Sequence, residues 1–120
     1  MRLLTLVMGA SLKEVRYSNK AIKKLRAFDH PVKAFGLRKG KVLDVEIDTE
    51  LVNYEDIHTV TLYLNPKRQQ EFYDYIIALK PQRVLFNPGT ENPEFYELLK
   101  TNKIDFEEAC TLVLLSTSQY

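Results

Sequence analysis

The residues best suited to binding chemistry stand at Gly9-Ala10-Ser11, directly after the apolar residues 3–8. A glycine adopts backbone angles closed to other residues and lets a ligand approach the main chain. Peptide N–H groups in such a turn are donors for an anion, above all beside a helix start. The turn has one glycine where a dinucleotide-binding loop usually has three, and the Walker pattern G-x-x-x-x-G-K-[ST] is absent. We interpret it either as an anion-binding turn or as an ordinary turn, in which Ser11 and Glu14 form a capping box.

A second candidate turn, Asn87-Pro88-Gly89-Thr90, follows the apolar residues 83–86. Its Pro-Gly pair favours a tight turn, and Asn92-Pro93 predicts a helix start with exposed N–H groups. The threonine and the backbone of the turn are candidates to hold a phosphate or a polar amide. Glu91 suits an anion site only if its side chain points away or accepts a hydrogen bond. The alternative is a well-formed turn without a ligand.

Three cations, Arg38, Lys39 and Lys41, follow the second predicted strand. A fold that binds NAD normally places an Asp or Glu there, which binds the ribose hydroxyls. Cations at this place favour a phosphorylated ribose, as in coenzyme A or NADP. The alternative is a solvated hairpin tip.

Tyr17 and Ser18 stand at the start of an amphipathic segment, residues 18–28. Ser18 is a candidate helix N-cap, or its hydroxyl faces the same anion as the amide of Asn19. Tyr17 is expected to form a wall of the crevice.

The elements that position these residues alternate between strand and helix. Strands are expected at 3–8, 30–36, 58–64, 83–86 and 104–109, and helices at 18–28, 65–79, from 92 and at 110–120. Residues 37–48 predict a hairpin around Lys39-Gly40. Continuous apolar strands separated by helices indicate a parallel sheet covered on both faces. We predict an α/β fold, a Rossmann-like doubly wound and mostly parallel sheet, in one domain spanning 1–120.

In such a sheet the turns that follow the strands lie at one edge, and ligands bind where the strand order reverses. This geometry predicts that the turn at 9–11, Asn65-Pro66 and the turn at 87–90 border one crevice.

The ordered set GAS…RYSNKAIKKL, VTLYLNP, LKPQRVLFNPGTEN and EEACTLVLL resembles the small single-domain CoA-binding proteins, whose fold is similar to the CoA-binding module of succinyl-CoA synthetase. The resemblance extends through most of the chain and implies cofactor binding. It implies contacts at Gly9, Ala10, Ser11, Tyr17, Ser18, Asn87, Pro88, Gly89 and Cys110. Our reading of the turns adds Arg38 and Thr90. The chain departs from the family pattern at residues 36–48, where the family has an Asn-Pro turn and this chain has the basic hairpin.

Cys110 follows the last predicted strand. Its thiol either approaches the thiol of CoA, where it could form a mixed disulfide, or is buried and inert. His30 and His58 are expected at strand starts, on the opposite edge, so a Cys-His catalytic pair is not expected. No cysteine or histidine cluster has zinc spacing, and we expect no metal site.

The composition excludes several partners. The formal net charge is +1, the basic residues are scattered, and the tyrosines form no RNA-stacking signature, so neither nucleic acid nor a membrane is expected as a partner. One cysteine suits a reducing compartment, and no segment approaches the length of a membrane helix. We expect a cytoplasmic protein, with a homodimer or a partner enzyme chain open.

These observations predict non-catalytic binding of coenzyme A or an acyl-CoA through backbone amides. Whether the protein is an enzyme stays open, because the expected crevice holds no obvious general acid or base. The alternatives are an NADP-dependent reductase fragment or a CoA-dependent enzyme subunit, and a sensor whose ligand biases a partner surface.

Overall fold

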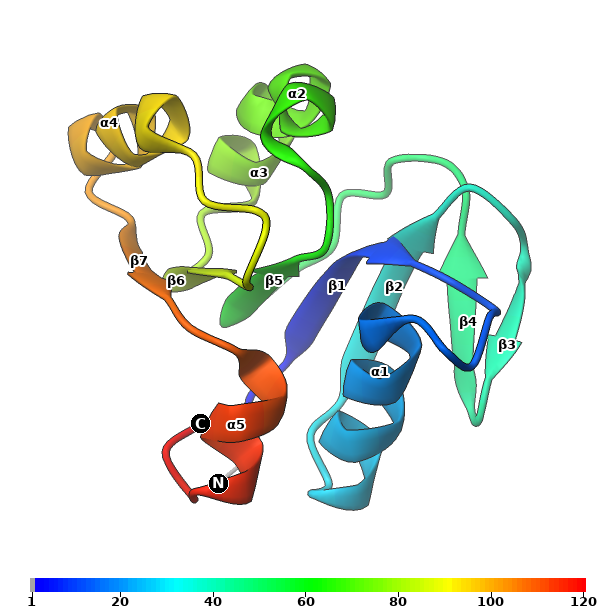
Figure 1. Ribbon diagram of the computed structural model, residues 1–120. Helices are drawn as coiled ribbons and strands as arrows, with labels where there is room; N and C mark the ends of the chain where they lie inside the picture. The colour runs from blue at the N-terminus through cyan, green and yellow to red at the C-terminus, as the bar shows by residue number, and fades with distance from the viewer. Residues whose placement is uncertain (1) are drawn as a thin grey trace.

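The apolar run near the N-terminus forms the central strand of a seven-stranded sheet in the computed structural model, which describes residues 2–120 (Figure 1). All neighbouring strands pair in parallel except β3 with β4, and the order is β3-β4-β2-β1-β5-β6-β7. Without the edge strand β3, this is the order of a doubly wound Rossmann sheet. The strands are β1 (Thr5–Ala10), β2 (Val32–Gly36), β3 (Gly40–Val42), β4 (Val45–Asp48), β5 (Thr59–Leu62), β6 (Arg83–Phe86) and β7 (Asp105–Glu108).

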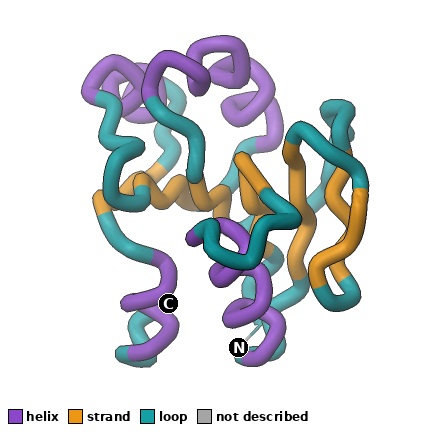
Figure 2. Tube along the Cα trace, turned by 45° about the vertical axis from the view of Figure 1, so that its right-hand side comes forward, coloured by secondary structure: helices purple, strands orange, loops and turns teal. Residues whose placement is uncertain are grey.

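Helices cover both faces of the sheet, and Figure 2 shows the two helical layers on either side of the strands. One layer holds α1 (Tyr17–Ala27) and α5 (Thr111–Ser116), and the other holds α2 (Pro66–Gln69), α3 (Tyr73–Leu79) and α4 (Pro93–Thr101). The Rossmann-like fold predicted from the sequence is confirmed.

Alternation along each strand divides the core into two clusters, because successive side chains point to opposite faces. Leu6 and Met8 of β1 pack toward α3 and α4, against residues such as Phe95. Val7 packs toward α1 and α5, with Ile22 among its cluster. Both faces of β1 are therefore buried, which explains its uninterrupted apolar sequence.

The predicted hairpin is present, but its turn was placed wrongly. The register pairs Gly40 with Ile47 and Val42 with Val45, so the chain turns at Leu43 and Asp44. Leu43 has a φ of +54°. Lys39-Gly40 was favoured because of its glycine. That glycine is instead the first residue of β3, where the side chain of Leu12 fills the space that a Cβ would occupy.

Two predictions about helix starts are wrong, and one is confirmed. α1 begins at Tyr17 after Arg16, so Ser18 lies inside the helix rather than at its N-cap. Ser11 and Glu14 form no capping box, because no helix begins at Ser11. The Asn-Pro caps do form: the side chain of Asn65 accepts a hydrogen bond from the N–H of Arg68.

The helix predicted over 65–79 is interrupted. A 3₁₀ turn, η1 (Gln70–Phe72), separates α2 from α3, and Lys80 ends α3 in the left-handed conformation with a φ of +51°. Across residues 2–120, no helix combines the length and the apolar character needed to cross a membrane.

Candidate functional site

The loops that leave the parallel strands gather at the carboxyl edge of the sheet. The strand order reverses at β1, which lies between β2 and β5, and a crevice opens at such a reversal in doubly wound sheets. The structure places at this edge the end of β1 with residues 11–16, and residues 37–39, 63–65, 87–92 and 109–110. The turns singled out from the sequence therefore share one edge.

Gly9 lies in the last part of β1, at a bulge, and has a φ of +93°. A Cβ added to it would lie 3.0 Å from the carbonyl carbon and oxygen of Tyr63 and 3.1 Å from the Leu64 side chain. The close approach that requires this glycine is therefore the packing of β1 against the segment after β5. A ligand is not needed to explain it.

Ala10 and Ser11 connect β1 to the helical layer. Ala10 is buried, and its carbonyl oxygen would be 2.3 Å from a Cβ added at Gly36. The Ser11 hydroxyl accepts a hydrogen bond from the N–H of Lys13 at 3.1 Å, and the Ser11 carbonyl accepts one from the amide of Asn19 at 2.9 Å. These contacts hold the loop ahead of α1 in place.

The first turn of α1 contains the next two candidates, with opposite exposure. Tyr17 is 69% exposed, and the ammonium group of Lys20 lies 5.7 Å from the centre of its ring. Ser18 is buried, as is Asn19, whose side-chain oxygen has no hydrogen-bond partner among the described residues. An unpartnered buried oxygen is costly, so it is a place where a donor from a ligand would be stabilised.

Asn87 uses its whole side chain inside the protein. Its Nδ2 donates to the Thr61 hydroxyl at 2.6 Å and to the Leu62 carbonyl at 2.9 Å. Its Oδ1 accepts from the N–H of Thr111 at 2.8 Å. The side chain thus ties β5, β6 and the start of α5 together. Its contribution to the site is to fix the turn that follows it.

The rest of this turn separates into an inner and an outer part. Thr90 is buried, and its hydroxyl donates to the Asn87 carbonyl at 2.7 Å. Pro88 and Gly89 are exposed, and a Cβ added to Gly89 would meet nothing within 4 Å. The φ of +93° explains this glycine, and the space above it is open. The Gly89 N–H donates to the carboxylate of Glu91 at 2.9 Å.

Sequence reasoning missed the buried amide that supports this turn from below. Gln69 donates to the carbonyls of Leu64 and Thr90, both at 2.8 Å, and accepts from the side chain of Asn92 at 2.9 Å. It thereby links the loops after β5 and β6. A signal was present, because Gln69 lies three residues before the inward-facing Phe72, at helical spacing.

The three cations after β2 lie in different surroundings. Arg38 is exposed, in the loop at the carboxyl edge. Lys39 is also exposed and borders a cavity on the hairpin. Lys41 lies farther along β3, with its Nζ 3.9 Å from Glu46 Oε1, so part of its charge is neutralised.

Cys110 is half-buried at the carboxyl edge, directly before α5. Tyr63 lies nearby, with its hydroxyl buried beside Thr61 and Thr111 but without a hydrogen bond to either. Burial raises the pKa of Tyr63 to about 12, although the two threonine hydroxyls partly offset the effect. The phenol therefore stays protonated at neutral pH. Sequence reasoning had not singled out Tyr63.

His30 and His58 precede β2 and β5 and so lie at the opposite, amino edge, as predicted. His30 Nδ1 accepts a hydrogen bond from the N–H of Leu3 at 3.0 Å, and His58 Nδ1 lies 2.7 Å from the Thr59 hydroxyl. Burial lowers the pKa of both histidines, and the charge of Arg83 lowers it further. Neither histidine lies on the edge that carries Cys110.

Comparison with known proteins identifies the class. The sequence matches the family described as "CoA binding domain" over residues 4–116. The chain belongs to this family. A search of curated proteins found no match.

Solved structures agree with the fold. The chain is 42% identical to an uncharacterized protein of known crystal structure, with a TM-score of 0.97 over 100% of this chain and 99% of that one. A Thermus thermophilus protein, cell-free ID.343, is 18% identical, with a TM-score of 0.86 over 99% and 91% of the two chains. A hypothetical protein from Pyrococcus horikoshii OT3 is 22% identical, with a TM-score of 0.85 over 94% and 81%. The two more distant proteins, at 18% and 22% identity, show that the fold is shared.

Proposed function

We propose that this chain, as a single domain, binds coenzyme A or an acyl-CoA without catalysing a reaction. The observation that carries the proposal is the gathering of five loop segments at the carboxyl edge beside the strand-order reversal, in a chain of the CoA-binding family. Ligands of doubly wound sheets bind at this place.

The diphosphate is placed on the backbone of Gly9, Ala10 and Ser11 and on the start of α1 at Tyr17 and Ser18. Main-chain N–H groups and the positive end of a helix favour an anion there. The buried side-chain oxygen of Asn19 lacks a partner and can accept a hydrogen bond from a hydroxyl or amide of the cofactor next to the diphosphate, but not from the diphosphate itself, which has no donor.

The two ends of the cofactor are assigned by charge. The phosphorylated ribose lies toward Arg38 and the other cations of the loop after β2. The neutral pantetheine passes Pro88, Gly89 and Thr90 on its way to Cys110. The carboxylate of Glu91, which accepts from the Gly89 N–H, disfavours a phosphate at this turn and suits the amide N–H groups of pantetheine. Asn87 acts indirectly, by holding the turn.

Thermal unfolding in the presence of CoA, acetyl-CoA, NAD or NADP, in parallel, tests the proposal. Ligand at 100 times its dissociation constant stabilises the folded state by about 2.7 kcal/mol. We expect CoA and acetyl-CoA to raise the melting temperature and NAD to leave it unchanged. A shift with NADP alone would contradict the proposal and favour the reductase alternative.

Ser11→Asp tests the placement of the diphosphate. A carboxylate at this position repels an anion in the loop, so we expect the CoA affinity to fall by about tenfold or more, equivalent to about 1.4 kcal/mol. Ser116→Asp adds the same charge to the last turn of α5 and is the matched control. Equal affinities of the two variants, measured by isothermal titration calorimetry, would contradict the assignment.

A further inference from the structure

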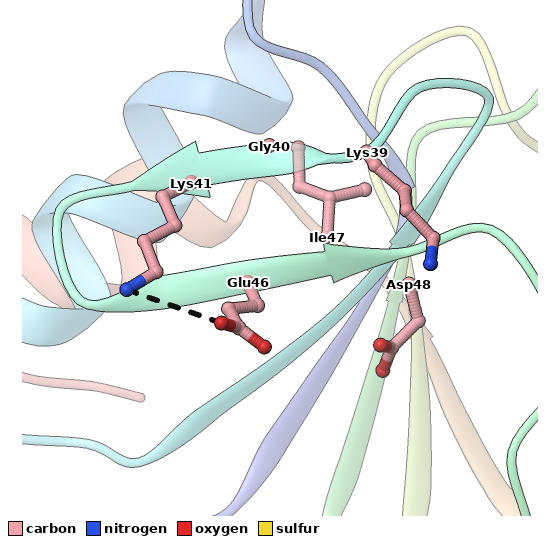
Figure 3. A pocket seen from close by; sticks show the side chains of 6 residues that line it. All are labelled: Lys39, Gly40, Lys41, Glu46, Ile47 and Asp48. Carbon is pink, nitrogen blue, oxygen red and sulfur yellow. Dashed lines mark ion pairs between the residues drawn. The ribbon is translucent and has the colours of Figure 1, made fainter.

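A cavity at the amino edge of the sheet lies outside the candidate site. It has a volume of about 220 Å³ and lies at the edge where α1 and α5 end (Figure 1). Its lining consists of Leu3, Phe28, His30, Leu115, Ser118 and Tyr120. The cavity on the β3–β4 hairpin, of about 280 Å³, has a different character, because the ion pair of Lys41 and Glu46 belongs to its lining (Figure 3). The lining of the amino-edge cavity contains no acidic residue.

Arg83 gives this edge a positive charge that no carboxylate neutralises within residues 2–120. It takes part in none of the ion pairs there. Its Nε donates a hydrogen bond to the Thr59 hydroxyl at 2.9 Å, but its Nη2 is buried and has no hydrogen-bond partner among the described residues. Burial of a guanidinium group without an acceptor for its N–H groups is costly. An anion close to Arg83 would reduce this cost.

Tyr120 connects the arginine with the cavity. The centre of its ring lies 4.6 Å from Arg83 Cζ, and Tyr120 is also one of the residues that line the cavity. The charge of Arg83 extends to His30, on the other side of the cavity lining, because it adds to the effect of burial in lowering the pKa of that histidine. Charges act strongly over short distances where little water separates them. Arg83 therefore stabilises an anion in the cavity without having to touch it.

The hydrogen bonds of the lining leave a donor available at His30. Its Nδ1 accepts from the N–H of Leu3 at 3.0 Å, which places the proton of the neutral ring on Nε2. Within residues 2–120 this Nε2–H has no acceptor. The Tyr120 hydroxyl is already used, because the Thr5 hydroxyl donates to the Leu3 carbonyl and accepts from Tyr120. The groups left for a ligand are thus the N–H of His30 and the exposed hydroxyl of Ser118.

The negative groups near the cavity are weaker or already paired. The C-terminal end of a helix carries a partial negative charge, but α5 is only six residues long, and N–H groups of residues 117–119 donate to carbonyls of its last turn. Asp29 is exposed and forms an ion pair with Arg2 at 3.2 Å. Asp105, which faces Arg83 in the strand register, is exposed and forms no ion pair with it. The charge of Arg83 therefore determines the sign of the field in the cavity.

We propose that the amino-edge cavity binds a small organic carboxylate with an apolar body, independently of the cofactor at the carboxyl edge. The carboxylate accepts hydrogen bonds from His30 and Ser118 in the field of Arg83, and the body of the ligand packs on the three apolar lining residues. Inorganic phosphate has no apolar surface to bury there. Pockets for drug-sized ligands have roughly 300–1,000 Å³, so the smaller cavity suits a molecule of the size of benzoate.

Benzoate and benzamide test the proposal, because they have nearly the same shape and differ in charge. Each is titrated into isotope-labelled protein and followed by two-dimensional NMR of the backbone amides and the histidine rings. We expect benzoate to shift the signals of the His30 ring and the Ser118 amide, with an affinity about tenfold or more above that of benzamide.

Arg83→Met tests the source of the charge, since methionine keeps an apolar side chain and removes the guanidinium group. We expect the affinity for benzoate to fall about tenfold and that for benzamide to stay within about twofold. Arg68→Met, at an exposed position of α2 in the other helical layer, is the matched control and should keep both affinities. The ratio of the two affinities does not depend on the fraction of folded protein, so a destabilised Arg83→Met variant still gives an answer.

Several results would overturn the proposal. Absence of binding by both probes would show that the cavity holds no ligand of this class, and equal affinities would show that charge plays no part. Tighter binding of inorganic phosphate, with shifts of the same signals, would assign the cavity to another class of anion. Benzoate shifts confined to residues 9–11 and abolished by CoA would place the probe at the carboxyl edge. Failure of CoA to bind would leave this proposal unaffected and would contradict only the proposed function.

Discussion

Glycines at two places on the carboxyl edge have the same backbone angle for different reasons. Gly9 and Gly89 both have a φ of +93°, but only Gly9 is surrounded by other atoms, 3.0 Å from a Cβ position. Sequence reasoning treated both as places where a ligand approaches. Packing alone explains the glycine at position 9, whereas the space above Gly89 is open.

Substitution by alanine separates these causes. Both Gly9→Ala and Gly89→Ala introduce a side chain at positive φ, which costs about 1–2 kcal/mol. Gly9→Ala adds a clash with the Tyr63 backbone, so we expect it to lower the free energy of unfolding by at least about 1 kcal/mol more than Gly89→Ala. Urea denaturation of the two variants measures the difference, and equal losses would show that packing at Gly9 is unimportant.

Gly9 is also a poor place to test ligand binding, for the same reason. A larger residue there disturbs β1 before any ligand is added. Ser11, which is only half-buried and lies outside β1, tests the same loop without this difficulty.

Among elements, the contacts between β5, β6 and α5 depend on the single side chain of Asn87. Replacing it with the similarly sized Leu leaves the Thr111 N–H, the Leu62 carbonyl and the Thr61 hydroxyl without this partner. We expect Asn87→Leu to lower the free energy of unfolding by about 3 kcal/mol, because buried groups without partners cost about 1–3 kcal/mol each. Denaturant unfolding measures the loss.

Asn53→Leu, in an exposed loop, is the matched control and should change the free energy of unfolding by less than about 0.5 kcal/mol. A similar small effect at both positions would contradict the structural role of Asn87.

The regular elements could be predicted because their signals are local. Apolar runs marked β1, β5 and β6, and the Asn-Pro pairs marked the starts of α2 and α4. The hairpin turn could not be placed, because Leu43 adopts a positive φ that its residue type disfavours. The 3₁₀ turn between α2 and α3 could not be predicted either, because the inward-facing residues of the segment 65–79 keep helical spacing.

The candidate site was predictable in its place and less so in its parts. The alternation of strands and helices predicted that the turns after β1, β5 and β6 lie at one edge of the sheet, and the structure brings them together there. Gln69 escaped notice because its role depends on contacts between loops that are distant in sequence. The cations of residues 37–48 were predicted to favour a phosphorylated ribose, with a solvated hairpin tip as the alternative.

At the scale of the whole molecule, the two edges of the sheet carry different chemistry. The amino edge holds His30, His58 and Arg83, and the carboxyl edge holds the candidate site. The pKa of both histidines is lowered in the folded state, chiefly by burial. Below their ordinary pKa near 6.5, the unfolded chain binds protons that the folded chain resists.

The stability contributed by the neutral histidines is therefore fully present above about pH 7 and falls as the pH drops below about 6.5. We expect the free energy of unfolding to decrease between pH 7 and pH 5, and His30→Asn with His58→Asn to reduce this slope. Urea titrations at several pH values measure it. An unchanged slope in the double variant would show that other groups cause the loss.

The hairpin of β3 and β4 occupies the place where doubly wound sheets have a crossover helix between two parallel strands. It joins β2 through a short exposed loop, and its own turn is two residues long. Val42, Val45 and Ile47 pack this hairpin into the core, so its exposed residues, rather than the whole hairpin, can be exchanged without disturbing β1 and the loop that follows it. Substitution of these exposed residues is therefore a way to change which nucleotide the protein binds while the rest of the fold is kept.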